Sequence, residues 1–288
     1  ATDPKSEPTP ICHWIAFAAW PKIGQDEKPF DPVWKAKDAD MAVTWTKSLI
    51  ARKRVWKDGL FTITVDAPNV LPFTAGQFLQ LGLGDEENHI HRPYSVASPH
   101  GTELEFYIVL VEDGELTPLL WALNEGDSLD VSERAAGRFT LERAPDAENL
   151  WLVATGTGLA PYIAMLRTEE PWERYQRICV VHGVRHEQDL SYQDELRGYS
   201  EKYPGRFAYV PATTRDESST GLQGRIPSLF EQGSLEEFAE TSLTSTDSTI
   251  LLCGNPAMLD DMEAQLEKRG MKRHRSRAPG QIVVERYW

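Results

Sequence analysis

Residues 150–161 have the sequence Leu-Trp-Leu-Val-Ala-Thr-Gly-Thr-Gly-Leu-Ala-Pro, an apolar run followed by a glycine-rich turn and a proline. A short apolar run bounded by turn residues predicts a buried strand, and proline is favoured at the first position of a helix. Glycines between strand and helix let the backbone approach a phosphate, which the N-terminus of a helix attracts. The stretch therefore predicts a nucleotide-binding strand–turn–helix unit, with a purely structural tight turn as the alternative. It differs from the Rossmann fingerprint, because Pro161 stands at the third glycine position and no acidic residue follows at the expected distance.

Strands and helices alternate in the rest of the C-terminal half. Apolar runs predict three more buried strands, at residues 178–181, 207–210 and 249–253. Helical patterns separate them, at residues 162–167, 194–202 and 256–269. This alternation predicts a parallel sheet with helices on both faces.

Residues 44–141 follow a different pattern, in which apolar and polar residues alternate with a period of two. The alternation is clearest in three segments, at residues 61–65, 77–81 and 104–109. Short strands separated by turn residues at this spacing predict an antiparallel Greek-key barrel. A helix is expected within the barrel, because Thr117 is a favourable N-cap and Pro118 follows at the first helical position.

The chain is thus expected to form an antiparallel barrel over residues 41–145 and a parallel-sheet α/β domain over residues 146–288. Residues 1–40 contain six prolines and no sustained periodicity. Their apolar run, 11–20, is too short to span a membrane and lacks a preceding basic stretch, so neither an anchor nor a secretory signal is expected. We expect the working domain to begin at Met41, with the preceding arm dispensable or a start-site artefact. Packing of the arm's three tryptophans on the body is the alternative.

Composition argues against several classes of protein. The net charge of −14 disfavours general nucleic-acid binding, and no apolar run approaches the ~20 residues of a membrane helix. Three scattered cysteines, Cys12, Cys179 and Cys253, are too few for a disulfide framework or a four-thiolate iron–sulfur cluster. We therefore expect a cytoplasmic protein without a metal site.

The segment His-Arg-Pro-Tyr-Ser at residues 91–95 has the side chains that a flavin requires. Arg92 offers a planar fork of donors to pyrophosphate oxygens. Tyr94 offers a flat face to the flavin ring, and Ser95 a small donor for the ring nitrogen that receives hydride. The alternative is an edge strand broken by Pro93.

Three further segments of the C-terminal half suggest ligand contacts. Cys253-Gly254-Asn255-Pro256 closes a predicted central strand and opens a helix, which places Cys253 at the carboxyl end of the sheet, where open α/β folds bind ligands. The alternative is that Cys253 is a small buried apolar side chain. Arg215 and Arg225 both follow the third strand of the domain and together form a candidate clamp for a 2′-phosphate, with two ordinary surface arginines as the alternative. The final residues, Tyr287 and Trp288, are expected to stack on a planar group, with filling of a core gap as the alternative.

Two groups of basic residues contrast with the acidic composition. One lies within residues 268–277 and the other within residues 47–57. Either could be a solvated face or a docking surface for an acidic protein.

Taken together, the segments Arg92-Pro93-Tyr94-Ser95, Thr-Gly-Thr-Gly-x-x-Pro, Cys-Gly-Asn-Pro-x-Met and the terminal Tyr-Trp closely resemble the bacterial ferredoxin/flavodoxin–NADP reductase family. The resemblance covers residues 41–288 almost completely. It implies an FAD-binding barrel followed by an NADP-binding α/β domain, in agreement with the pattern-based expectation.

The resemblance also assigns roles to individual residues. The residues that it implies for FAD are Arg92, Pro93, Tyr94, Ser95, Tyr107, Ile108, Val109, Glu115, Leu116, Thr117, Tyr287 and Trp288, with Thr157 on the flavin or the nicotinamide side. Those that it implies for NADP(H) are Val184, Arg185, Thr214, Arg215, Arg225, Asn255, Pro256 and Ala257. Ser95, Cys253, Glu285 and Tyr287 would serve the hydride transfer, with Tyr287 moving aside to admit the nicotinamide.

The function expected from the resemblance is electron transfer between NADPH and a one-electron carrier, an acidic ferredoxin or flavodoxin, by a monomeric protein. The two basic groups are the candidate docking sites. Two alternatives stay open. One is an NADPH-dependent flavin or quinone reductase on the same fold, and the other is a flavoprotein that only senses the NADPH/NADP balance.

Overall fold

The computed structural model describes residues 43–85, 87–217 and 221–286. These residues belong to one compact unit that begins at Val43. The expectations for residues 1–40, for Met41 and for the terminal pair Tyr287 and Trp288 lie outside the described residues.

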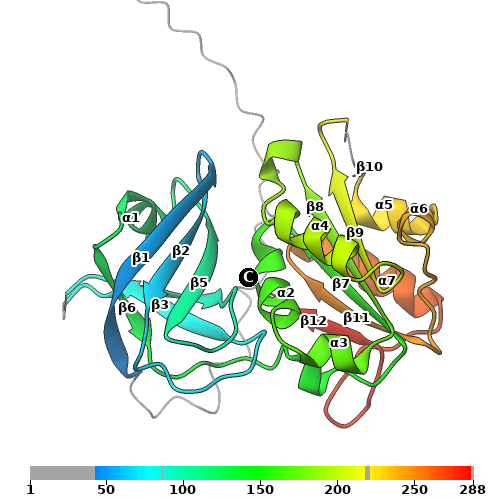
Figure 1. Ribbon diagram of the computed structural model, residues 1–288, viewed down its shortest axis with the longest axis horizontal. Helices are drawn as coiled ribbons and strands as arrows, with labels where there is room; N and C mark the ends of the chain where they lie inside the picture. The colour runs from blue at the N-terminus through cyan, green and yellow to red at the C-terminus, as the bar shows by residue number, and fades with distance from the viewer. Residues whose placement is uncertain (1–42, 86, 218–220, 287–288) are drawn as a thin grey trace, which may run out of the picture. The chain divides into compact units, whose positions relative to one another are not determined.

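The first sheet is antiparallel, with the strand order β4–β3–β6–β1–β2–β5 (Figure 1). Its strands are β1 (Trp45–Lys57), β2 (Leu60–Asp66), β3 (Phe78–Leu83), β4 (Ile90–Ser95), β5 (Glu103–Val109) and β6 (Ser128–Ser132). A bridge between Val96, which follows β4, and Phe106 in β5 links the two edges of the sheet. The sheet therefore curves into a barrel, and Phe61, Ile63 and Val65 of β2 fill its core. The predicted antiparallel barrel is confirmed.

The second sheet is parallel, with the order β10–β9–β8–β7–β11–β12. Its strands are β7 (Asn149–Thr155), β8 (Arg177–Val184), β9 (Phe207–Thr213), β10 (Leu222–Gln223), β11 (Ser248–Cys253) and β12 (Ile282–Glu285). The predicted parallel sheet is confirmed. Its strands β7, β8, β9 and β11 each contain one of the four predicted apolar runs. The short edge strands β10 and β12 carried no signal strong enough to predict.

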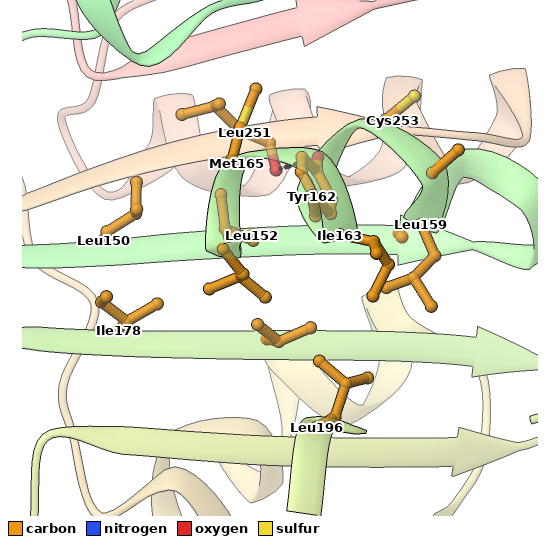
Figure 2. Close-up of a cluster of buried hydrophobic side chains, with 14 of the residues drawn as sticks. Leu150, Leu152, Leu159, Tyr162, Ile163, Met165, Ile178, Leu196, Leu251 and Cys253 are labelled. Atoms are coloured by element: carbon orange, nitrogen blue, oxygen red, sulfur yellow. Dashed lines mark hydrogen bonds between the residues drawn. The ribbon is translucent and has the colours of Figure 1, made fainter. Parts of the chain in front are cut away.

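Helices cover both faces of this sheet, as the alternation predicted (Figure 1). On one face, Leu150 and Leu152 of β7 pack with α2 (Ala160–Leu166) and with Leu196 of α4 (Gln193–Lys202). Figure 2 shows this cluster, including the hydroxyl of Tyr162, which donates to the carbonyl of Leu251 at 2.7 Å. On the other face, Trp151 and Val153 pack with α5 (Ile226–Glu231), α6 (Ser234–Ala239) and α7 (Pro256–Lys268). Alternate residues of one strand thus supply two separate cores.

The structure rules out one alternative and corrects one expectation. β4 continues through Pro93 instead of breaking there, because β4 is an edge strand and edge strands tolerate proline. Thr117 is not the N-cap of α1 (Thr117–Ala122): the N-cap residue is Leu116, and no side chain caps this end. The Thr117 hydroxyl instead bonds both the amide of Val111, at 2.9 Å, and its carbonyl, at 3.1 Å, which closes the loop before the helix.

The remaining short elements lie between the two sheets in sequence or between strands of the second sheet. They are η2 (Leu141–Arg143), η3 (Gly156–Leu159), α3 (Glu170–Arg174) and η4 (Glu187–Asp189). The barrel and the parallel sheet meet through buried polar contacts. The hydroxyl of Tyr107 in β5 donates to Ser191 Oγ at 2.9 Å, and Thr62 Oγ1 in β2 lies 2.9 Å from the hydroxyl of Tyr192. These contacts fix β2 and β5 against the segment that precedes α4, so that a site can be assembled from both parts of the chain.

Candidate active site

A cavity of about 330 Å³ lies where the barrel faces the first turn of the parallel sheet. Strands β4 and β5, the loop before α1, η3 and the start of α2 line it. The lining residues are Arg92, Pro93, Tyr94, Ser95, Tyr107, Ile108, Val109, Val111, Gly114, Glu115, Leu116, Thr117, Thr157 and Ala160. The structure thus brings together every described residue that the sequence assigned to FAD. Sequence analysis missed Val111, Gly114 and Ala160, which flank the assigned segments without a distinguishing side chain.

The guanidinium side chain of Arg92 belongs to the lining of the cavity. Arg92 forms an ion pair with Glu115, and its Nη1 donates to the carbonyl of His91 at 2.7 Å. Both charged side chains stay more than half exposed, at 53% for Arg92 and 67% for Glu115. An exposed pair of this kind contributes little to stability, so Arg92 remains available to an anion that enters the cavity.

Tyr94 supplies an aromatic wall. The residue is half-buried in β4 and lines the cavity. Burial raises the pKa of Tyr94 to about 12, although the positive charge of Arg92 opposes the shift. The ring therefore stays a neutral phenol at physiological pH, and a neutral ring suits stacking on another planar group.

Ser95 and Glu285 connect the barrel to the end of the parallel sheet. Ser95 is buried at the end of β4 and forms a hydrogen bond with the Glu285 side chain. In the register of β11 and β12, Glu285 lies opposite Cys253, which is fully buried. Three of the four residues expected to serve the hydride transfer therefore lie close together, and the fourth, Tyr287, is outside the described residues.

Glu285 is expected to hold a proton at neutral pH. Its Oε2 is inaccessible and has no hydrogen-bond partner within the described chain. Burial raises the pKa of Glu285 from 4.5 to about 8, while the hydrogen bond with Ser95 opposes the shift. A carboxyl that stays protonated can donate as well as accept hydrogen bonds.

Replacing Glu285 with glutamine should stabilise the protein at high pH. The folded-state pKa lies above the unfolded value, so the glutamic acid is tolerated at low pH and loses stability as the pH rises from 4.5 through 8. Glu285→Gln should therefore unfold like the parent at pH 5 but be more stable at pH 9 by about 2–4 kcal/mol. Thermal unfolding of both proteins at the two pH values measures the difference. An equal difference at both pH values would contradict the buried carboxyl.

Close packing requires a glycine at position 158 of the glycine-rich turn. A Cβ on Gly158 would lie 2.7 Å from the carbonyl oxygen of Cys253, and one on Gly254 would lie 2.2 Å from Thr155 Oγ1. The amide of Asn255 donates to the same Thr155 Oγ1 at 2.7 Å. The turn after β7 and the turn after β11 are therefore in close backbone contact. For Gly158, the sequence favoured approach to a phosphate and left a structural tight turn as the alternative; the contact with the Cys253 carbonyl supports a structural role as well.

A buried histidine supports the same turn and was missed by sequence analysis. His182 in β8 is fully buried, and its Nε2 lies 3.1 Å from the carbonyl oxygen of Gly156. Burial lowers the pKa of His182 to about 4, so the ring is neutral and donates to this carbonyl. Its position within a continuous apolar strand gave no signal of this contact.

The arginines expected to bind NADP(H) lie at the carboxyl edge of the parallel sheet. Arg185 follows β8, Arg215 follows β9, and Arg225 follows β10, directly before α5; all three are exposed. Backbone hydrogen bonds tie the first two turns together, from Thr214 N to Val184 O at 3.1 Å and from Arg215 N to Arg185 O at 2.9 Å. The described part of the chain contains no ion pair of Arg185 or Arg215, so both are available to a phosphate.

The turn after β11 contributes a helix start. Asn255 caps α7, because its side-chain oxygen accepts from the amides of Ala257, at 3.0 Å, and Met258, at 3.3 Å. Pro256 occupies the first turn, as its place in the sequence predicted. Asn255, Pro256 and Ala257 therefore lie at a helix N-terminus beside Cys253, on the same sheet edge as the arginines.

Comparison with known proteins decides the family. Residues 152–264 match the oxidoreductase NAD-binding domain family. A flavodoxin/ferredoxin–NADP reductase of Shigella flexneri is 41% identical over 246 residues, which cover 85% of this chain and 99% of that protein. The chain belongs to the flavodoxin/ferredoxin–NADP reductase family. A ferredoxin–NADP reductase of Pseudomonas aeruginosa is 34% identical over 241 residues, covering 80% of this chain and 93% of that protein. The resemblance inferred from the sequence motifs is thus confirmed.

A solved structure of the same family matches the fold described above. The crystal structure of a ferredoxin NADP⁺ reductase from Neisseria gonorrhoeae, with bound FAD and NADP, has a TM-score of 0.81 and 33% identity. The match covers 85% of this chain and 99% of that chain. This reductase-family architecture therefore extends over both sheets described here.

Proposed function

We propose that this chain is a flavoprotein oxidoreductase that moves electrons between NADPH and a one-electron carrier, a ferredoxin or flavodoxin. The observation that carries the proposal is the cavity in which Arg92, Tyr94 and Ser95 face Thr157 of the glycine-rich turn. Its volume and mostly apolar lining suit a planar ring. The reductase names of the relatives and the FAD and NADP in the Neisseria gonorrhoeae structure support the same function.

FAD, when bound, supplies an acceptor that takes two electrons together and releases them singly. The residues of this chain would bind and orient it. Arg92 would pair with the pyrophosphate, exchanging its contact with Glu115 for a more strongly charged partner. Tyr94 would cover one face of the ring, and the backbone groups of β5 at Tyr107, Ile108 and Val109 would line its edge.

Ser95, Cys253 and Glu285 would set the place where hydride passes. The Ser95 hydroxyl, held by Glu285, would bond at the accepting nitrogen. Glu285 would hold a proton at its carboxyl beside this point, where its Oε2 is inaccessible to water. The buried Cys253, at the carboxyl end of β11, would limit where the nicotinamide can lie.

The proposed partner is an acidic electron carrier, and the two basic groups are the proposed docking surface. Several of their members already have partners within the protein, however. Arg269 pairs with Glu236, Arg273 with Glu263, and Arg52 with Glu103. Lys53 bonds the carbonyls at the end of α1. For docking, acidic groups of the carrier would therefore have to replace these intramolecular partners. Otherwise, docking would use the neighbouring basic residues for which the described part of the chain contains no ion pair.

The proposal places a monomer in the reducing cytoplasm and includes no nucleic-acid or membrane partner. Cys179 and Cys253 are buried and form no disulfide, consistent with a reducing compartment. Among the described helices, none has the length and hydropathy to cross a membrane.

A coupled assay tests the function. Purified protein with FAD should reduce cytochrome c with NADPH only when a ferredoxin is added, and the rate at limiting ferredoxin should fall steeply with added salt. Equal rates with quinones or free flavin and no response to ferredoxin or flavodoxin would instead favour a small-molecule reductase. Slow turnover with every acceptor, despite full flavin content, would favour a redox sensor.

A further inference from the structure

The two turns that carry Arg185 and Arg215 are joined by more than the backbone. Asp216 follows Arg215, and its carboxylate reaches across to the turn after β8. Oδ1 lies 2.9 Å from Nδ1 of His186, and Oδ2 accepts from the amide of Glu187 at 2.8 Å. Both carboxylate oxygens are therefore bonded to the neighbouring turn.

The rest of Asp216 is also fixed. Its own carbonyl accepts a hydrogen bond from Thr213 Oγ1 at 2.7 Å, which holds the residue against the end of β9. On the other side, the amide of His186 donates to Asp189 Oδ2 at 3.0 Å, so the partner turn is braced within η4. These hydrogen bonds lower the pKa of Asp216, that from His186 contributing most, and keep it ionised.

A carboxylate next to a phosphate-binding arginine is an unexpected feature. It would normally pair with the guanidinium and repel a phosphate dianion. Here each of its oxygens is bonded to the neighbouring turn instead, one to His186 and the other to the Glu187 amide. The carboxylate therefore acts as a bridge between two turns while leaving the adjacent guanidinium uncommitted.

We propose that Asp216 is a positioning residue that fixes Arg185 beside Arg215, a member of the expected Arg215–Arg225 clamp, at the spacing selecting a 2′-phosphorylated nucleotide. The inference rests on the proposed NADPH-dependent function and deepens it. Asp216 itself does not touch the nucleotide. It acts through His186 and Glu187, by holding the turn that bears Arg185 against the turn that bears Arg215. Without it, the described residues of the two turns are joined by the two backbone hydrogen bonds and by the bond from Thr214 Oγ1 to Val184 O at 3.3 Å. The guanidiniums then sample more arrangements, which weakens binding of a phosphate that needs both arginines.

Steady-state kinetics of the holoenzyme with NADPH and NADH test this role. Asp216→Ala should raise the KM for NADPH about tenfold while leaving kcat and the KM for NADH within about twofold, because NADH lacks the 2′-phosphate. Asp216→Asn can keep both hydrogen bonds and removes the charge, so its KM for NADPH should equal the parent's or fall below it. Glu201→Ala, which removes one exposed negative charge from α4, is the matched control and should change neither KM.

Direct binding gives a second readout that does not depend on turnover. Calorimetric titration with adenosine 2′,5′-bisphosphate should show weaker binding to Asp216→Ala by the same factor, whereas AMP should bind both proteins equally. In thermal unfolding, Asp216→Ala should not lose enough stability to explain its weaker binding. The backbone hydrogen bonds of the parallel sheet remain in this variant.

Three results would overturn the inference. If both Asp216 variants bind NADPH more tightly, the carboxylate only repels the phosphate; if neither changes its affinity, Asp216 does not position the arginines. Either result leaves the proposed function intact, because the parent still prefers NADPH. A parent protein that uses NADPH no better than NADH would overturn the inference and the NADPH assignment together.

Discussion

Replacing Arg92 with alanine is expected to raise the dissociation constant for FAD by about 100-fold, because the cavity then loses its charged donor for the pyrophosphate. Arg92 lines the cavity and forms a hydrogen bond with the His91 carbonyl and an ion pair with Glu115. Quenching of flavin fluorescence by the flavin-free protein measures the constant directly.

Two matched variants separate this effect from a general loss of charge or of an ion pair. Arg52→Ala breaks an exposed arginine–glutamate pair on the same barrel, with Glu103, and should leave FAD affinity unchanged. Glu115→Gln removes the partner of Arg92 and keeps the guanidinium, so FAD should bind equally well or more tightly. Loss of affinity in Glu115→Gln equal to that in Arg92→Ala would assign the effect to the ion pair and contradict the pyrophosphate role.

Replacing Gly158 with alanine is expected to lower kcat about 100-fold and to cost about 1–3 kcal/mol of stability. The added Cβ would meet the backbone carbonyl of Cys253 at 2.7 Å, and backbone cannot move aside as a flexible side chain can. The glycine-rich turn and the Cys253 turn would have to separate, which displaces both from the Ser95–Glu285 contact. Stopped-flow reduction by NADPH and thermal unfolding measure the two effects.

Gly198 provides the control for this substitution. It lies within α4, and a Cβ there would meet no atom within 4 Å. Gly198→Ala should keep the parent kcat and gain up to about 1 kcal/mol from helix propensity. If Gly158→Ala is as active as Gly198→Ala, the close contact between the two turns does not set the geometry of the site.

Much of this fold could be predicted from local sequence patterns. The alternation at residues 61–65 and the apolar run at residues 150–154 have the periods of a half-buried and a fully buried strand, and both are strands in the structure. Pro161 predicted the start of α2 correctly, because the proline ring is already set for the first helical turn. These signals lie within a few residues of the elements that they specify.

Features that depend on distant contacts could not be predicted in this way. Gly158 is required by a backbone 95 positions further along the chain, at Cys253. The buried Glu285 depends on the pairing of β12 with β11 and on Ser95 of the barrel. Asp216 resembles any surface carboxylate until the turn after β8 is placed beside it. Residue type indicated candidate chemistry, but only the fold shows which groups meet.

Thr117 illustrates a local signal that the tertiary context overrides. Threonine followed by proline is a good helix start, but the loop from Val111 to Thr117 uses the hydroxyl on both backbone groups of Val111. The helix then begins without a side-chain cap. The hydroxyl stabilises the cavity wall instead of the helix end, which is consistent with its place among the lining residues.

The central claim is that the cavity between β4, β5 and the glycine-rich turn holds a flavin that NADPH can reduce. The most direct test is stopped-flow absorbance of the purified protein, saturated with FAD, after mixing with NADPH and, separately, with NADH. We predict one bound FAD per chain, rapid bleaching of the flavin absorption by NADPH, and much slower bleaching at an equal concentration of NADH. A protein that takes up no FAD, or whose bound flavin keeps its absorption in excess NADPH, would contradict this claim.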